Sequence, residues 1–89
     1  MESKFGKIDL IDVREIHEYK GGHVPTAKNI PMGTILAQPE KYLNKSKEYY
    51  IICHAGSRSL RTCKNLSDQG YNVINILGGT KSYPKSLVK

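Results

Sequence analysis

The second half of the chain contains a strand–helix–strand pattern, which restricts the fold more than any other feature of the sequence. Residues 49–53 (Tyr-Tyr-Ile-Ile-Cys) form an apolar, β-prone run, and residues 73–77 (Val-Ile-Asn-Ile-Leu) form another. Between them, residues 58–69 predict a helix that ends at Gly70, which we expect in the left-handed conformation. Segments of these lengths form a right-handed crossover between parallel strands. The sequence therefore predicts an α/β fold with a mainly parallel central sheet.

One face of the predicted helix should be buried. Leu60, Cys63 and Leu66 recur at three-residue steps, whereas Arg61 and Lys64 fall between them. We expect the first three side chains to pack against the sheet and the two basic residues to face solvent.

The remaining segments predict shorter elements. They are a β-rich run at residues 7–13, one helical turn at 15–19 stopped by Gly21 and Gly22, a very short strand at 27–30, a helix at 34–43 interrupted near Pro39, and a short last helix at 80–87. Ligands of open α/β sheets bind beyond the carboxyl ends of the strands. We therefore expect Cys53 and the end of the first strand, at Asp12 and Arg14, to lie at that edge.

Length and composition limit the classes of protein to consider. The chain has 89 residues, which we interpret as a single domain over residues 1–89. It contains no apolar run near the length of about 20 residues that a membrane span needs, and its first residues do not resemble a secretory signal. The net charge of +6 comes from scattered lysines, with no nucleic-acid-binding motif. We therefore expect a cytoplasmic protein that binds neither membranes nor nucleic acid, with a positive field that attracts small anions.

Cys53 stands between the apolar strand and the start of the predicted helix. The first N–H groups of a helix lack intrahelical partners and carry partial positive charge, so an anionic sulfur is favoured there. This environment should lower the thiol pKa below its usual value of about 8.5. The loop that would surround the sulfur consists of His54, Ala55, Gly56, Ser57, Arg58 and Ser59. A strand-end cysteine is often only a core residue, but the flexible glycine, the hydroxyls and the arginine favour a nucleophilic or sulfur-carrying cysteine.

The other cysteine and the histidines carry weaker signals. Cys53 and Cys63 are too few for a disulfide-stapled scaffold and lack metal-type spacing, which fits a reducing compartment. We expect Cys63 in the core, with a resolving thiol that pairs with Cys53 as the alternative. His54 either contacts substrate or faces solvent. His23 is interpreted as a turn residue, and with His17 and His54 it gives no zinc-type spacing.

A series of motifs, taken together and in this order, resembles the rhodanese-like domains. The motifs are Ile11-Asp12-Val13-Arg14-Glu15, Glu18-Tyr19, Gly22-His23-Val24-Pro25, Ala27-Lys28-Asn29-Ile30-Pro31, the Cys53 loop ending in Arg58-Ser59, Gly70-Tyr71-Asn72-Val73 and Leu77-Gly78-Gly79. The resemblance covers residues 8–83. It implies a three-layer fold in which a mainly parallel sheet of about four to five short strands is flanked by helices. It also places Cys53 at the position of the persulfide-forming cysteine.

The resemblance implies a two-step sulfur transfer. The Cys53 thiolate would attack the outer sulfur of thiosulfate or of a persulfide donor and become a persulfide. A thiol or cyanide, or a sulfur-relay protein, would then take the sulfur. The N–H groups of the loop would hold the anionic sulfur, and Arg58 would add charge stabilisation or help to dock the donor. No metal or organic cofactor is required.

Two other functions are compatible with parts of the sequence. The domain could be a sulfur-carrier or regulatory interaction module with little turnover of small donors. The less favoured alternative is a phosphatase, because related phosphatase loops resemble Cys-x5-Arg, whereas four residues separate Cys53 from Arg58 here. The shorter loop suits a single sulfur atom better than a phosphoryl group.

The chain departs from the family pattern at a few positions. Few residues precede the first strand, so we expect a domain truncated at its N-terminus. Thr26 replaces a common glycine, and Tyr83 stands near a usual tryptophan. Asp12 and Arg14, together with Glu18, are expected to form charge pairs that support the site rather than perform chemistry.

Overall fold

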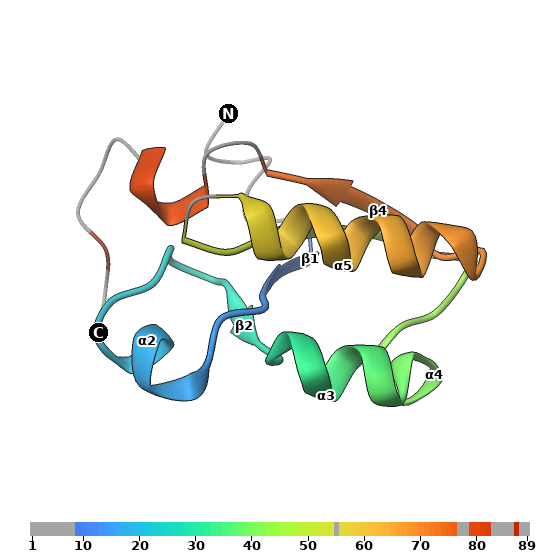
Figure 1. Ribbon diagram of the computed structural model, residues 1–89, viewed down its shortest axis with the longest axis horizontal. Helices are drawn as coiled ribbons and strands as arrows, with labels where there is room; N and C mark the ends of the chain where they lie inside the picture. Colours follow the sequence, from blue (N-terminus) through green and yellow to red (C-terminus); the bar gives the residue numbers. More distant parts are fainter. Residues whose placement is uncertain (1–8, 55, 77–78, 83–86, 88–89) are drawn as a thin grey trace.

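The computed structural model describes residues 9–54, 56–76, 79–82 and 87 (Figure 1). Its elements, in chain order, are β1 (Asp9–Asp12), α2 (Ile16–Lys20), β2 (Lys28–Asn29), α3 (Met32–Ala37), α4 (Pro39–Tyr42), β3 (Glu48–Ile52), α5 (Ser57–Asp68), β4 (Asn72–Asn75) and the 3-10 helix η1 (Gly79–Ser82). No helix in these ranges combines the length and the apolar character needed to cross a membrane. The expected N-terminal truncation concerns residues 1–8, and Tyr83 also lies outside the described residues.

The four strands form one sheet in the order β2-β1-β3-β4, and every pair is parallel. Ile51 of β3 is opposite Ile11 of β1 on one side and Asn75 of β4 on the other. The predicted strand–helix–strand unit is therefore confirmed as β3-α5-β4. Since all strands run the same way, their carboxyl ends, including the residues that follow Ile52 and Asp12, meet at one edge.

Alternation along the strands divides the core into two clusters, one on each face of the sheet. Ile11 and Ile51 point to the face that α3, α4 and α5 cover, where Ile35 and Leu66 are completely buried. Leu10 and Ile52 point to the opposite face. Residues of α2 and of the segment that follows it cover this face. The expected three-layer arrangement is thus present, with four strands among the described residues. Figure 1 shows α3 and α5 lying side by side.

The buried stripe of α5 differs from the predicted one. Its buried residues are Ser59, Thr62, Cys63 and Leu66, whereas Leu60 is 59% exposed. Steps of three and four residues connect the buried set, as expected at about 100° per residue. Leu60 lies about 120° around the helix from Leu66. The prediction that Leu60 is buried was wrong because a strict three-residue step drifts off one face.

Prolines and glycines in the sequence correctly predicted most of the other helix boundaries. The helix predicted at residues 34–43 is broken where expected, because α3 ends at Ala37 and α4 begins with Pro39, whose missing N–H is harmless at a helix start. Gly70 has φ 96°, the left-handed conformation predicted after α5. The helix expected at residues 80–87 is instead the short η1, and residues 83–86 lie outside the description.

Candidate active site

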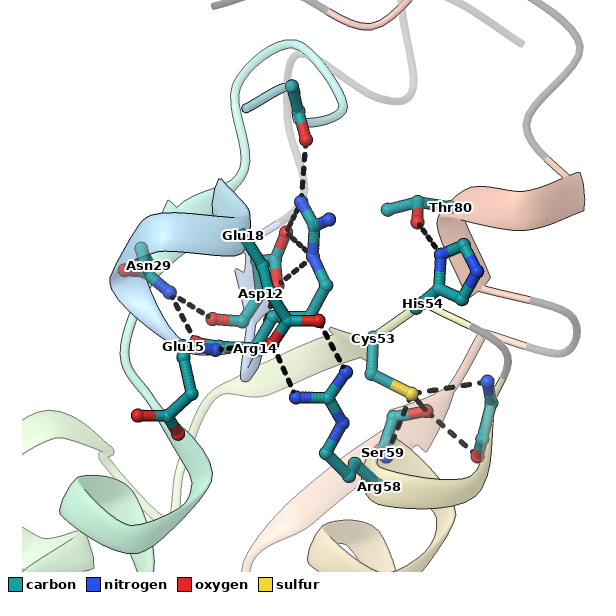
Figure 2. Close-up of polar contacts among 12 residues, drawn as sticks. Asp12, Arg14, Glu15, Glu18, Asn29, Cys53, His54, Arg58, Ser59 and Thr80 are labelled. Carbon is teal, nitrogen blue, oxygen red and sulfur yellow. Dashed lines mark hydrogen bonds and ion pairs between the residues drawn. The ribbon is translucent and has the colours of Figure 1, made fainter. Parts of the chain in front are cut away.

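Cys53 directly follows β3, and its side chain lies on the α5 face of the sheet. The residue is 1% exposed and belongs to the same apolar cluster as Ile51 and Leu66. As far as burial is concerned, the interpretation of Cys53 as a core residue is therefore correct. The sulfur nevertheless points toward the start of α5 (Figure 2). It accepts hydrogen bonds from the backbone N–H groups of Gly56, at 3.1 Å, and Ser59, at 3.2 Å.

Gly56 and Ser59 shape the space around this sulfur. Gly56 precedes α5 with φ 95°, a conformation that side chains rarely adopt, and this turn places its N–H against the sulfur. Ser59 is fully buried, and its Oγ lies 3.3 Å from the sulfur of Cys53, close enough to accept a hydrogen bond from the thiol. The Ser59 hydroxyl also lies within hydrogen-bond distance of the Gly56 carbonyl, at 3.1 Å, and of Oδ1 of Asn75.

These contacts set the ionisation of the Cys53 thiol. Burial opposes the charged form and is the largest single influence. The hydroxyl of Ser59 and the N–H groups of Ser59, Gly56 and Arg58 act the other way and together outweigh it, so the pKa of Cys53 lies below its ordinary value. At any given pH, the thiolate fraction of Cys53 is therefore larger than that of a cysteine with the ordinary pKa. The direction agrees with the prediction made from the helix start.

Arg58 does not turn its guanidinium to the sulfur. Its Nη1 and Nη2 bind the two carboxylate oxygens of Glu18 in α2, at 2.6 Å and 2.9 Å (Figure 2). This two-point bond holds the pKa of Glu18 at about 2. The pair connects the first turn of α5 to α2, so Arg58 fixes the position of the loop while its positive charge is balanced locally.

Asp12 and Arg14 form a separate, buried ion pair at the end of β1. Nη2 of Arg14 lies 2.8 Å from Asp12 Oδ2 and donates a second hydrogen bond, of 2.7 Å, to the carbonyl of Gly22. Asn29 donates to the backbone carbonyls of both residues. The predicted pairing of Asp12 with Arg14 is thus present, while Glu18 pairs with Arg58. Neither Asp12 nor Arg14 is hydrogen-bonded to the sulfur within the described residues.

The other loop residues lie farther from the chemistry. His54 is exposed, and its Nδ1 lies 3.4 Å from the hydroxyl oxygen of Thr80 in η1. Ser57 is exposed as the first residue of α5, and Ala55 lies outside the described residues. His23 stacks on Tyr19 with ring centroids 3.7 Å apart, which is a packing role. The residue itself lies in an isolated β-bridge, and the turn follows at residues 25–26, so its interpretation as a turn residue was wrong by a few positions.

Helix η1 closes the site from the C-terminal side, which the sequence reasoning did not identify. The N–H of Thr80 donates a 2.7 Å hydrogen bond to the carbonyl of Cys53. Gly79, at φ 56°, approaches so closely that a Cβ there would lie 2.1 Å from the same carbonyl oxygen. Asn75 was missed as well. The signal that was available for it is the presence of one polar residue in the otherwise apolar run 73–77.

Comparisons with known proteins identify the family of the chain. The model of the family described as "Rhodanese-like domain" matches residues 2–86. The protein named "Putative sulfurtransferase YtwF" of Bacillus subtilis (strain 168) is 46% identical over 76 residues, which cover 83% of this chain and 71% of YtwF. "Putative sulfur carrier protein YrkF" of the same organism is 38% identical over 77 residues, 85% of this chain but 41% of YrkF.

Solved structures have the same fold. The protein SSP1007 from Staphylococcus saprophyticus superposes with a TM-score of 0.82 at 35% identity, covering 92% of this chain and 82% of that one. A structure of rhodanese with anions from E. coli gives a TM-score of 0.77 at 30% identity, covering 91% and 96%. The family match over nearly the whole chain and these folds lead to one conclusion: the chain belongs to the rhodanese-like domain family.

Proposed function

We propose that the chain is a sulfurtransferase in which Cys53 carries sulfane sulfur as a persulfide. The observation that supports this most directly is the position of the sulfur, which accepts hydrogen bonds from the N–H groups of Gly56 and Ser59 and has a lowered pKa. The name of YtwF, a sulfurtransferase, points the same way. Thiosulfate as the donor is the specific form of the proposal.

The proposed reaction has two displacement steps. The Cys53 thiolate attacks the outer sulfur of thiosulfate, the S–S bond of the donor breaks, and sulfite leaves with the bonding electron pair. The terminal sulfur of the resulting persulfide is then attacked by cyanide or by a thiolate, which returns Cys53 as a thiolate. Both forms of the cysteine are anionic, so the same N–H groups serve each of them.

The remaining site residues receive supporting roles in this proposal. Arg58, bound to Glu18, holds the first turn of α5 in place. Asp12 and Arg14 fix the segment between β1 and α2. His54, which is exposed and adjacent to Cys53 in the chain, would contact an incoming donor or acceptor.

The burial of Cys53 favours a second candidate, a sulfur carrier loaded by another protein. At 1% exposure, Cys53 offers almost no surface to a small anion, and a protein partner is better able to cause the movement that would expose its sulfur. The name of the relative YrkF, a sulfur carrier, also supports this candidate. Both candidates share the Cys53 persulfide and differ only in the donor.

Intact-protein mass spectrometry tests the proposal. Incubation with thiosulfate should add one sulfur to the wild-type protein, and cyanide should remove it with release of thiocyanate. Cys53→Ser should abolish the addition, while Cys63→Ser, the matched control, should keep it. Persistence of the added mass in Cys53→Ser would overturn the assignment. If thiosulfate fails but a cysteine-desulfurase persulfide loads Cys53 rapidly, the carrier function is the correct one.

A further inference from the structure

The hydroxyl of Ser59 lies within hydrogen-bond distance of three groups but has only one proton to donate. Its oxygen lies 3.3 Å from the sulfur of Cys53 and 3.1 Å from the carbonyl oxygen of Gly56, and it also contacts Oδ1 of Asn75. A hydroxyl donates one hydrogen bond and accepts up to two. Its single proton must therefore be directed to one of these neighbours, and the choice depends on whether the cysteine is protonated.

When the Cys53 thiol is protonated, the hydrogen bonds run in one direction, from Cys53 to Ser59 to Asn75. The S–H of Cys53 donates to Ser59 Oγ, and the hydroxyl of Ser59 donates in turn to Oδ1 of Asn75. The carbonyl of Gly56 is a second acceptor for the same hydroxyl proton. In this state the hydroxyl has two acceptors available, so loss of one of them is compensated by the other.

With an ionised sulfur, the direction must reverse. The thiol proton passes to a base in the buffer, and the hydroxyl of Ser59 turns its own proton to the anionic sulfur. The lone pairs of Oγ then face the amide of Asn75, which can offer an N–H once its amide group rotates, because the two ends of an amide have nearly the same shape. Among the described residues, no other donor is hydrogen-bonded to this oxygen, since the N–H groups of Gly56 and Ser59 both serve the sulfur.

We propose that Asn75 is a positioning residue that aligns the Ser59 hydroxyl on the Cys53 sulfur and favours its ionised form. The amide does so by exchanging an acceptor for a donor as the cysteine loses its proton. A hydrogen bond received by a hydroxyl strengthens the one that it donates, so the Asn75 N–H reinforces the contact between Ser59 and the thiolate. The register of the sheet makes this possible, because Asn75 pairs with Ile51, two residues before Cys53.

Other charged and titratable groups near the sulfur could also influence the ionisation of Cys53, and the effect of the Asn75 amide must be separated from theirs. On α5 these are Arg58, whose charge is balanced by Glu18 of α2, and Cys63, whose thiol has its pKa raised to about 11. His54 is adjacent in the chain and exposed. Asn75 itself carries no charge, so its influence on Cys53 passes through the orientation of one hydroxyl.

The test measures the pH dependence of alkylation of Cys53 by iodoacetamide, with the modified cysteine identified by peptide mass. Relative to wild type at pH 7, Asn75→Ala should react about threefold more slowly, because the Ser59 hydroxyl that donates to the thiolate loses the donor to its own oxygen, and nothing replaces it. Asn75→Asp should react about tenfold more slowly, since an ionised carboxylate only accepts and holds the hydroxyl proton away from the sulfur. In both variants, the pKa of Cys53 obtained from the pH dependence of alkylation should be higher than in wild type.

Two controls separate this effect from a general disturbance. Asn72→Asp introduces the same charge change on the same strand, at its exposed far end, and should leave the profile unchanged. In a Ser59→Ala background, Asn75→Ala should have no further effect, because there is no hydroxyl left to align. Since Asn75 is only partly buried, both of its variants should fold, which circular dichroism confirms, and Asn75→Ala alone decides the matter if the aspartate does not fold.

The proposal is overturned if Asn75→Ala has the wild-type profile, or if its slower alkylation persists in the Ser59→Ala background. The inference rests on the proposed function for the use made of the thiolate, but alkylation requires no sulfur donor. A protein that fails to form a persulfide yet shows the shifted profiles would disprove the sulfurtransferase and keep the role of Asn75.

Discussion

Cys53 and Cys63 lie in the same apolar cluster beneath the sheet, with 1% and 8% exposure, yet the pKa values of their thiols move in opposite directions. Burial raises the pKa of Cys63 to about 11, and the nearby charge of Cys53 adds to the effect. Burial acts on Cys53 as well, but the Ser59 hydroxyl and the N–H groups at the start of α5 reverse it. The opposite pKa shifts of two buried thiols therefore follow from the hydrogen-bond donors around each sulfur, not from a difference in burial.

The largest expected difference is the selectivity of alkylation between these two thiols. At pH 7 the thiolate fraction of Cys53 should exceed that of Cys63 by more than about a hundredfold, given a difference of two or more pKa units. Peptide mapping after brief iodoacetamide treatment should find the label on Cys53. In denaturant both cysteines should react at similar rates. Equal labelling in the folded protein would show that the N–H groups do not activate Cys53.

Gly79 provides a way to disturb the reactive cysteine through its backbone alone. A Cβ at residue 79 would lie 2.1 Å from the Cys53 carbonyl oxygen, and φ 56° already disfavours a side chain. Gly79→Ala should therefore destabilise the protein by at least about 2 kcal/mol and reduce the selectivity for Cys53. Thermal unfolding and the alkylation ratio measure the two effects.

The matched control for this substitution is Gly33→Ala. A Cβ at Gly33, inside α3, meets no atom within 4 Å, and alanine is the better helix former. This variant should be as stable as wild type or slightly more so, with unchanged selectivity. If Gly79→Ala behaves like Gly33→Ala, the close approach of η1 does not hold the Cys53 loop.

The sequence predicted those features of the site that depend on neighbouring residues. The parallel unit of β3, α5 and β4 and the place of Cys53 between strand and helix follow from apolar runs, glycines and helix-start chemistry within a few residues. The break at Pro39 and the left-handed Gly70 belong to the same class. Each of these is decided by local backbone preferences, which a single sequence contains.

The missed features depend on residues far apart in the chain. Glu18 and Arg58 are separated by 40 residues. Asn75 reaches Ser59 because the register of the sheet sets Asn75 opposite Ile51 and α5 packs against β4. The exposure of Leu60 depends on which face of α5 the sheet accepts, and spacing by threes could not decide this. Contacts between residues so far apart are determined by how the elements pack, so a local sequence pattern cannot predict them.

The pair formed by Glu18 and Arg58 tests whether distant charge matters beside direct hydrogen bonds. Glu18→Gln frees the positive charge of Arg58, so Cys53 should become more reactive by about twofold at pH 7, a small change because side chains that are about one-third exposed are screened by solvent. Stability should fall by about 0.5–1 kcal/mol at neutral pH. Glu48→Gln, at an exposed position that begins β3, is the control and should change neither quantity.

The same pair predicts a dependence of stability on pH. The folded pKa of Glu18, about 2, lies below the ordinary value of about 4.3 for an unfolded chain. The contribution of Glu18 to stability is therefore complete above about pH 5 and disappears as the pH falls toward 2. Urea unfolding at several pH values should show that the difference between wild type and Glu18→Gln narrows over this range. A constant difference would mean that the carboxylate is not stabilised by Arg58.

The smallest expected effect concerns Cys63 itself. Its raised pKa keeps the thiol protonated at neutral pH, so it is a poor nucleophile toward a persulfide on Cys53. Cys63→Ala should cost about 1 kcal/mol of stability through the lost sulfur contacts, while the alkylation rate of Cys53 and the mass gained from thiosulfate stay within about 1.5-fold of wild type. A large loss of sulfur transfer in this variant, without loss of folding, would instead identify Cys63 as the resolving thiol. The two cysteines would then be partners in one reaction, and the contrast between a reactive and an inert buried thiol would no longer describe this protein.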